Sequence, residues 1–323
     1  MTFDLRHPPQ FSTSGPDLYA AALDIIEWAD QHGFRRVALG EHHQSTDGYL
    51  PAPLVFAAAI GGRTRRIRAQ ISVLLAPLYN PVRLAEEIAV ADLCLQGRLD
   101  PAVAAGYVEA DFDMFGADYR GRGQTMEELI PFLRRAWTGE PFEYQGRTIQ
   151  VMPRPKQDPM RIYMGGGNRR TIERAVRLAD GFIAGGAEAW PIYREESVRL
   201  GKPDPGEFPR TGPMFLWVTA EDKAKVLERL RPHIRHQIDS YAVWTRGAFG
   251  RASGVYAEAA DDDPLTGRGS YQILDPEEAI QLGNSLGRRG WMMFNPLLAG
   301  IDPAEAWKML TLVEERVFPY LEA

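Results

Sequence analysis

Two adjacent histidines and a glutamate form the chemically richest cluster in the sequence. Glu41, His42 and His43 follow the short apolar run 36–39, in a chain of 323 residues that contains six histidines. Imidazole titrates near neutral pH, so this cluster suits acid–base chemistry or hydrogen bonding to a bound cofactor. It is a weak metal site, because neighbouring side chains of an extended segment point to opposite faces. The alternative is structural, with one histidine hydrogen-bonded to loop carbonyls.

A glycine-rich turn is the second cluster. Residues 165–171 read Gly-Gly-Gly-Asn-Arg-Arg-Thr and join a β-type run to a helical pattern. Glycines let backbone N–H groups approach an anion, a helix start adds partial positive charge, and arginines pair with phosphate. The segment lacks the P-loop pattern, so it does not indicate nucleoside-triphosphate hydrolysis. We interpret it as a candidate phosphate-binding turn; a glycine-rich turn without a ligand is the alternative.

Small residues also end the apolar run 99–104. Gly106 would let a planar group approach the backbone, and Tyr107 can stack on such a group or donate a hydrogen bond. A tight turn with a packing tyrosine explains the same residues without a ligand.

Cysteine content and charge exclude several kinds of site and partner. Cys94 is the only cysteine, so neither an internal disulfide nor a cysteine-rich zinc site can form. It lies in the apolar stretch 88–95, where we expect a buried, inert thiol. The net charge of −6 disfavours a sequence-independent nucleic-acid binder. We see neither a secretory signal nor an apolar run near the ~20 residues of a membrane span, and expect a cytoplasmic protein.

Helical and β-type patterns alternate along the chain, and they must position these clusters. Helical periodicity is clear in 17–32, 53–61, 82–95, 125–138, 169–179 and 303–320. The expected strands are 2–5, 36–39, 67–75, 99–104, 161–164, 181–184, 214–218 and 290–294, with a hairpin at 142–144 and 148–151. Eight strand–helix units favour one α/β domain over residues 1–323, a (β/α)8 TIM barrel. Residues 200–270 break the rhythm, and we interpret them as an insertion before the last strand, part helix and part mobile loop, that acts as a lid.

The motifs and their order resemble the luciferase-like monooxygenase family. The resemblance spans nearly the whole chain except 200–270. The segments that carry it are 40–43, 81–86, 97–100, 106–107, 137–140, 153–155, 165–167, 179–181, 296–297 and 317–319.

This resemblance implies a homodimeric barrel that binds FMN, or the deazaflavin coenzyme F-420, at the carboxyl ends of its strands. FMN members typically take reduced flavin from a separate reductase and use O₂ on a small organic substrate. It implies a non-proline cis peptide at Ser72–Val73 against the flavin ring, with His42 nearby. The implied phosphate-binding residues are Gly165, Gly166, Gly167, Asn168, Arg170 and Thr171.

One position departs from the family pattern. Luciferase-type members have an arginine just before the glycine of the fourth strand's exit, whereas this chain has Ala105. The phosphate would then be held by Arg169 or Arg170, or the ligand would differ. Small residues at this position also occur in F-420-dependent relatives, whereas the Glu-His-His form favours the FMN branch. A non-catalytic flavin-binding relative and, more remotely, a metal-dependent hydrolase using the Glu41 cluster remain as alternatives.

Overall fold

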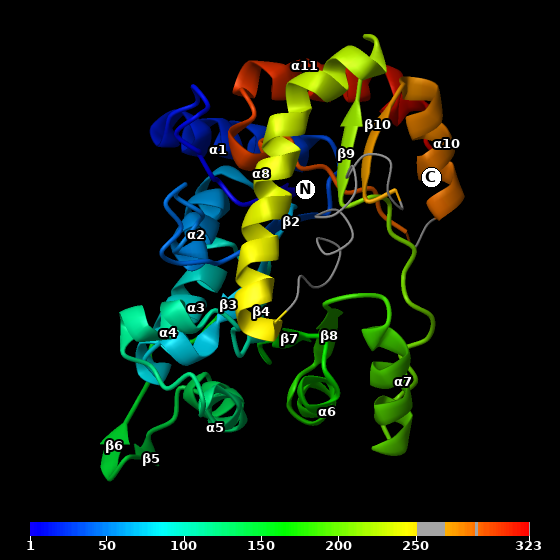
Figure 1. Cartoon of the computed structure of the whole chain (residues 1–323). Helices are drawn as coiled ribbons and strands as arrows, with labels where there is room; N and C mark the ends of the chain where they lie inside the picture. The colour runs from blue at the N-terminus through cyan, green and yellow to red at the C-terminus, as the bar shows by residue number, and fades with distance from the viewer. Residues whose placement is uncertain (251–268, 288–289, 323) are drawn as a thin grey trace. The chain divides into compact units, whose positions relative to one another are not determined.

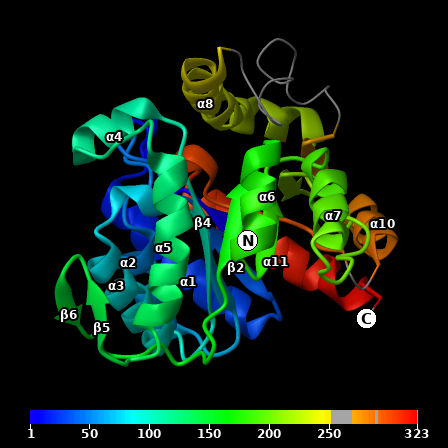
Figure 2. The same ribbon diagram turned by 90° about the horizontal axis from the view of Figure 1, so that it is seen from below.

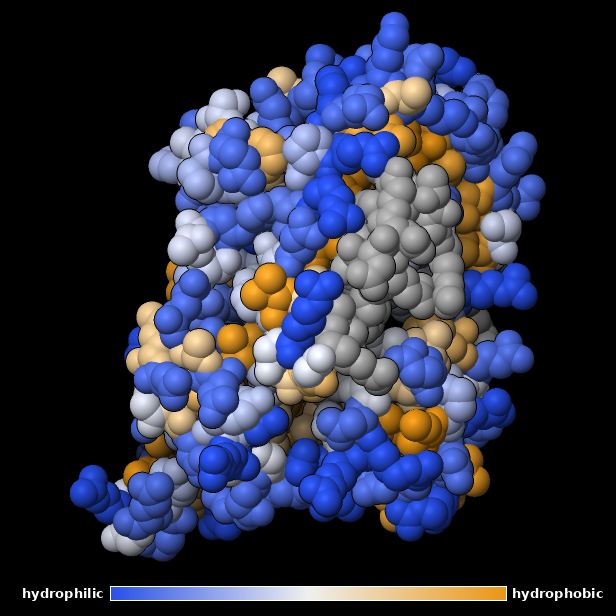
Figure 3. Space-filling model, viewed as in Figure 1, coloured by the Kyte–Doolittle hydropathy of each residue, from blue (hydrophilic) through white to orange (hydrophobic). Residues whose placement is uncertain are grey.

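The computed structural model describes residues 1–250, 269–287 and 290–322. The chain forms two compact units. Their helices and strands are labelled in Figure 1. The first contains Met1–Trp28, Ser45–Tyr49 and Glu207–Ala323, and the second contains Ala29–Gln44 and Leu50–Gly206. Polar and charged side chains cover most of the face shown in Figure 3, with apolar residues in smaller patches. No helix within the described ranges is both long and apolar enough to cross a membrane.

A parallel sheet forms the centre of the second unit. Its strands follow the order β2 (Arg36–Leu39), β3 (Arg68–Leu75), β4 (Leu99–Ala104), β7 (Tyr163–Gly166) and β8 (Gly181–Ala184). All neighbouring pairs in this series are parallel, so their carboxyl ends share one edge. Most residues of these strands are apolar, and Val37, Ile71 and Val103 are fully buried. The parallel α/β arrangement expected from the sequence is therefore confirmed in this unit.

Helices follow these strands, and all but the short one at Glu109–Phe115 pack against one another in chain order (Figure 2). They are α2 (Pro53–Arg63), α3 (Pro81–Cys94), α4 (Glu109–Phe115), α5 (Arg122–Ala136), α6 (Arg169–Leu178) and α7 (Ala189–Arg199). A short 3-10 turn, Ala76–Leu78, links β3 to α3, and the hairpin β5 (Phe142–Tyr144)–β6 (Arg147–Ile149) follows α5. Local sequence sets the start of α3, because the Asn80 side chain accepts hydrogen bonds from the backbone N–H groups of Val82 and Arg83.

Cys94 corrects one expectation, since its side chain is exposed rather than buried. The apolar stretch 88–95 lies in α3, whose buried face includes Leu84, Ile88 and Ala91. Cys94 instead follows the exposed Val90 by one helical turn, on the opposite face. Apolar composition indicated burial, but the position on the helix decides it.

The described part of the first unit contains three further strands. These are β1 (Thr2–Phe3), β9 (Phe215–Val218) and β10 (Tyr271–Leu274), with the helices α1 (Gly15–Gln31), α8 (Lys223–Phe249), α10 (Pro276–Leu286) and α11 (Pro303–Arg316). Short 3-10 turns lie at Leu298–Gly300 and Phe318–Tyr320. β9 pairs in parallel with β10, and Leu216 of β9 also bridges to Phe294.

The region from residue 200 onward differs from the expected pattern in two places. Instead of a strand at 290–294, isolated bridges form at Trp291 and Phe294. The two residues pair with different segments, because Trp291 bridges to Thr211 and Phe294 bridges to Leu216. Within the expected insertion, α8 is one helix of 27 residues despite Pro232 in its interior. β10 was not expected, and the predicted mobile part of the insertion falls largely on residues 251–268, outside the described ranges.

A buried arginine organises the start of the first unit. The Arg6 side chain is fully buried and donates to the Asp4 carboxylate from Nε (3.1 Å) and Nη2 (2.8 Å). The Asp47 carboxylate lies 3.8 Å from Nη1. The rings of Tyr49 and Tyr241 flank the guanidinium, with centroids 5.2 and 5.6 Å from Cζ. Two carboxylates and two rings thus compensate the burial of this charge.

Candidate active site

The Glu41 carboxylate, just beyond β2, is the centre of a buried hydrogen-bond network. Oε1 accepts from Tyr79 Oη at 2.8 Å and pairs with His43 Nε2 at 3.0 Å. Oε2 accepts from the backbone N–H of Leu75 at 2.7 Å. Burial and the charge of Glu41 raise the pKa of Tyr79 well above its ordinary value, so this phenol stays protonated and donates. Glu41 therefore has both oxygens occupied and is suited to holding its neighbours in place.

The two histidines point in different directions. His43 joins Glu41, and the ring of Phe115 meets it edge-on, with centroids 4.7 Å apart and an interplanar angle of 69°. The His42 ring instead lies beside that of Tyr107, with centroids 5.9 Å apart. This agrees with the expectation that the three side chains of the Glu-His-His motif would not converge. Within residues 1–250, 269–287 and 290–322, no three His, Cys, Asp or Glu side chains are arranged to hold a metal ion.

The end of β3 contacts the glycine-rich turn. The Ser72–Val73 peptide bond is cis, as the family resemblance implied, and the strand register shifts between Ser72 and Leu74. A Cβ placed on Gly165 would lie 2.5 Å from Val73 Cγ1. The sequence therefore needs a glycine at position 165 to let β3 and β7 approach each other.

The rest of the glycine-rich turn leads into α6. A Cβ on Gly166 would lie 2.3 Å from Thr171 Cγ2, so this position also requires the smallest residue. Asn168 accepts from the backbone N–H of Thr171 at 3.0 Å and caps α6. Gly167 is open: a Cβ there would meet no atom within 4 Å. The turn thus joins β7 to the capped start of α6 and leaves Gly167 exposed.

The two arginines of the turn differ in their partners. Arg169 is paired with Glu196 of α7 at 3.0 Å, with Glu195 4.0 Å away. Arg170 is exposed, and within the described residues no carboxylate lies within ion-pair distance of it. Of the two cations expected to hold a phosphate, only Arg170 is uncommitted to an acid.

Arg122 is a further cation at this edge, and sequence reasoning missed it. Its Nε donates to the carbonyl of Gly106 at 3.1 Å, and its Cζ lies 3.8 Å from the centroid of the Tyr119 ring. No carboxylate of the described chain pairs with it, since its hydrogen bonds go to backbone carbonyls. The Tyr119 hydroxyl donates to the carbonyl of Tyr107 at 3.2 Å. The signal in the sequence was an arginine between two glycines just before a helical pattern.

The first turn of α5, which holds Arg122, contacts α6. A Cβ on Gly123, next to Arg122, would lie 3.2 Å from Nη2 of Arg174. Arg174 lies one helical turn after Arg170 on α6, so the two share a helix face. The first turn of α5 has no side-chain cap, so its backbone N–H groups are left for other acceptors. Arg174 itself is paired with Glu127 of α5 at 2.9 Å, so among the described residues Arg122 and Arg170 are the arginines of these two helix starts that have no carboxylate partner.

Asp111 of α4 is the second residue that the sequence analysis missed. Its side chain is 1% exposed, and neither carboxylate oxygen has a hydrogen-bond partner among the described side chains. Burial raises the pKa of Asp111 to about 6. The charge and the backbone N–H of His43 lower it, whereas the charge of Glu41 raises it. A buried acid next to the Glu41 network was not visible in the local sequence pattern.

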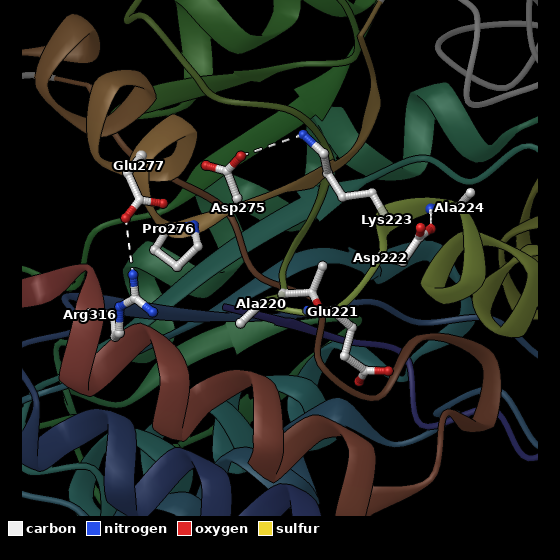
Figure 4. Close-up of a pocket in the computed structure, with 10 residues that line it drawn as sticks. Ala220, Glu221, Asp222, Lys223, Ala224, Asp275, Pro276, Glu277 and Arg316 are labelled. Carbon is white, nitrogen blue, oxygen red and sulfur yellow. Dashed lines mark hydrogen bonds and ion pairs between the residues drawn. The ribbon is translucent and has the colours of Figure 1, made fainter.

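A separate pocket of about 570 Å³ lies in the first unit, where β9 and β10 end (Figure 4). Its charged groups pair with one another: Lys223 with Asp275 at 3.6 Å, and Arg316 with Glu277 at 3.0 Å. Asp222 and Asp275 cap the helices α8 and α10 that begin there. Because its charges are paired and its helix starts are capped, this pocket has fewer free groups to bind a phosphate than the turn at 165–171 has.

Known proteins resemble this chain in sequence and in fold. The oxygenase component of the flavin-dependent trigonelline monooxygenase of Acinetobacter baylyi is 30% identical over 149 residues, 44% of this chain and 41% of that protein. An F420-dependent glucose-6-phosphate dehydrogenase of Kribbella flavida is 25% identical over 92% of this chain and 94% of its own length. Many of the matches to curated relatives span only about half the relative's length.

Solved structures share the fold over the whole chain. The oxygenating constituent of the 3,6-diketocamphane monooxygenase of Pseudomonas putida, a type II Baeyer-Villiger monooxygenase in complex with FMN, matches with a TM-score of 0.73 at 21% identity. The alignment covers 100% of this chain and 98% of that one. The sequence pattern of the luciferase-like monooxygenases matches residues 1–279. The chain belongs to the luciferase-like monooxygenase family.

Proposed function

We propose that this chain is a flavin-dependent oxidoreductase, and specifically the oxygenase of a two-component monooxygenase that uses reduced FMN and O₂ on a small organic substrate. The observation that carries this proposal is the meeting of four strand ends in the second unit. Glu41 and its two histidines follow β2, the Ser72–Val73 peptide lies in β3, Tyr107 follows β4, and the glycine-rich turn follows β7. Parallel α/β folds place their ligands at this edge of the sheet.

The residues at this edge fit a flavin phosphate. A Cβ at Gly165 or Gly166 would collide with Val73 or Thr171, so the backbone of this turn keeps its shape only with glycine at both positions. The start of α6 and the guanidinium groups of Arg170 and Arg122 supply the positive charge that a phosphate needs. Ser72, Val73, Gly106 and Tyr107 would line the flavin ring. Arg122, anchored to Gly106, would replace the arginine that the family carries at position 105.

Each side chain of the Glu-His-His motif has a distinct role in this proposal. A bound flavin supplies the redox chemistry with O₂. His42, beside Tyr107, holds or moves the proton that the oxygenation step requires. Glu41 keeps His43 oriented and joins the ends of β2 and β3, so that His42 is presented from a rigid loop. His42 and His43 are both buried, which keeps water away from the reacting centre.

Hydride transfer with coenzyme F-420 is the alternative function, and Ala105 is the observation that favours it. The Kribbella flavida relative, which covers most of the chain, is named for F420 dependence. Titrating the purified apoprotein with reduced FMN and with F-420 separates the two activities. Tighter binding of F-420 would replace the monooxygenase proposal with the hydride-transfer one.

The decisive measurement compares FMN with riboflavin, which lacks the phosphate. We expect Arg122→Gln and Arg170→Gln each to weaken FMN binding by about tenfold and to leave riboflavin binding unchanged. Arg120→Gln, at an exposed arginine two residues before Arg122, is the matched control and should bind both like the wild type. Equal FMN affinity in all variants would remove the phosphate assignment. Failure to bind any flavin or F-420 would overturn the proposed function.

The partners follow from the same proposal. A separate flavin reductase would supply reduced FMN in the cytoplasm, and the chain would form one (β/α)8 barrel with an insertion before its last strand. We also propose a homodimer, formed through the outer faces of α2 and α3. Val55 is 72% exposed and Val90 is 46% exposed on these packed helices, with Cys94 one turn beyond Val90. Val90→Glu should convert the dimer to a monomer in analytical ultracentrifugation, whereas a monomeric wild type would exclude it.

A further inference from the structure

α4 contacts the histidine loop at three points. Asp111 and Phe115 are one helical turn apart on this helix, and both face His43. The backbone carbonyl of Ala110, also on α4, accepts a hydrogen bond from the side chain of Gln44, the residue after His43. One short helix thus holds the two residues that follow His42.

α4 is itself fixed to the end of β3. Phe112, adjacent to Asp111, packs into a buried cluster with Leu75 and Leu78. Leu75 is also the residue whose backbone N–H donates to Glu41. The position of Asp111 is therefore set by the same strand end that fixes the Glu41 network.

The carboxyl group of Asp111 is an unusual group to bury at this place. It is nearly inaccessible, and neither of its oxygens has a hydrogen-bond partner among the described side chains, which is costly for an ionised acid. The titratable groups that face it are His43 and Glu41 from the end of β2. Tyr79, from the end of β3, is bound to the same Glu41 and stays neutral. A buried acid kept here with no side-chain donor, and only the backbone N–H of His43 beside it, points to a role other than stability.

We propose that Asp111 is a positioning residue of the candidate active site, which sets the orientation of His43 and, through the adjoining peptide, that of His42. The effect of Asp111 on turnover rests on the proposed function, whereas its effect on the orientation of the two histidines does not. Asp111 gains or loses its charge near pH 6, so the histidine loop should change its arrangement across that pH. When Asp111 is ionised, its charge attracts the ring and backbone N–H of His43; when it is protonated, this attraction is lost.

Nuclear magnetic resonance of the full chain tests the positioning without relying on activity. We expect the backbone amide signals of His42 and His43 to shift with a midpoint near pH 6 in the wild type. Asp111→Asn, which is isosteric and uncharged, should abolish this step. Asp113→Asn removes an exposed carboxylate of the same helix and should retain it. Amide shifts that are the same in wild type and Asp111→Asn would overturn the proposal.

Kinetics provide the second readout. In the flavin-loaded enzyme, kcat/KM of the wild type should rise through pH 6, and Asp111→Asn should be about tenfold less active with this rise removed. If Asp111→Asn lowers kcat/KM equally at every pH and keeps the wild-type pH profile, the role of Asp111 is merely structural and the proposal is overturned. If no flavin binds, the proposed function fails, while the amide titration still decides the role of Asp111.

Discussion

The Glu41 carboxylate accepts the backbone N–H of Leu75 at 2.7 Å, so a side chain just beyond β2 is joined to the last residue of β3. Backbone pairing between these strands is in register only as far as Leu39 and Ile71. Glu41 extends the connection past that point, into the segment where the strands separate and the candidate site begins. The carboxylate therefore takes the place of a backbone hydrogen bond between the two strands.

Removing this carboxylate should destabilise the second unit. In Glu41→Leu, three buried donors, from His43, Tyr79 and Leu75, lose their acceptor, and we expect the free energy of unfolding to fall by about 3 kcal/mol. Glu41→Gln keeps one carbonyl oxygen and should lose less. Glu109→Gln, at an exposed glutamate on α4, is the control and should change little. Denaturant unfolding measures all three, and equal stability of the Leu and Gln variants would contradict the network.

Glycine at position 165 should be indispensable for the contact between β3 and β7. Gly165→Ala places a Cβ 2.5 Å from Val73 Cγ1, which forces Val73 or the strand to move. We expect a loss of about 1–3 kcal/mol in unfolding free energy and weaker flavin binding. Gly167→Ala meets no atom within 4 Å and should behave like the wild type in both assays. Identical behaviour of the two variants would show that this contact has no energetic role.

Asp111 should make the protein less stable as pH rises. Its folded pKa of about 6 lies above the value of about 4 in the unfolded chain, so the folded state holds the proton more tightly. The wild type should therefore lose stability relative to Asp111→Asn between pH 4 and 6 and stay below it at higher pH. The difference should reach on the order of 1–3 kcal/mol at pH 8 and vanish near pH 3. Thermal unfolding from pH 3 to 8 measures it, and a pH-independent difference would contradict the raised pKa.

Arg6 should be the most sensitive charged position of the first unit. Arg6→Met leaves Asp4 buried without its cation, and we expect a loss of about 3–5 kcal/mol. Asp47, in contrast, keeps its hydrogen bonds to His236 and Tyr49. Adding Asp4→Asn removes the uncompensated charge and should restore part of that loss. Comparing the single and double variants by denaturant unfolding isolates the pair. A double variant less stable than Arg6→Met would contradict this account.

Local patterns in the sequence predicted those elements whose apolar residues recur with a clear period. The strands of the second unit and the helices α1, α3, α5 and α6 are of this kind. α4 was missed because only Asp111 and Phe112 of its seven residues are buried, whereas Met114 and Phe115 are exposed. Such a helix has no amphipathic pattern to detect. Its position comes from the packing of Phe112 on Leu75 and Leu78, which no local window contains.

The candidate site was predictable in its motifs but not in its connections. The Glu-His-His motif and the glycine-rich turn stand out in the sequence, and the resemblance implied the cis peptide that the structure contains. The partners of these motifs are distant: Tyr79 lies 38 residues from Glu41, and Arg122 lies 16 residues from Gly106. Because such pairs form only in the folded chain, composition and periodicity do not predict them.

The three donors gathered on Glu41 have a consequence for how this sequence can evolve. A substitution at position 41 leaves the donors of His43 and Tyr79 unsatisfied, so neutral drift there requires compensating changes at 43 and 79. The three positions should therefore be inherited as one covarying group among relatives. A lineage that replaces Glu41 with an apolar residue should also carry a phenylalanine in place of Tyr79.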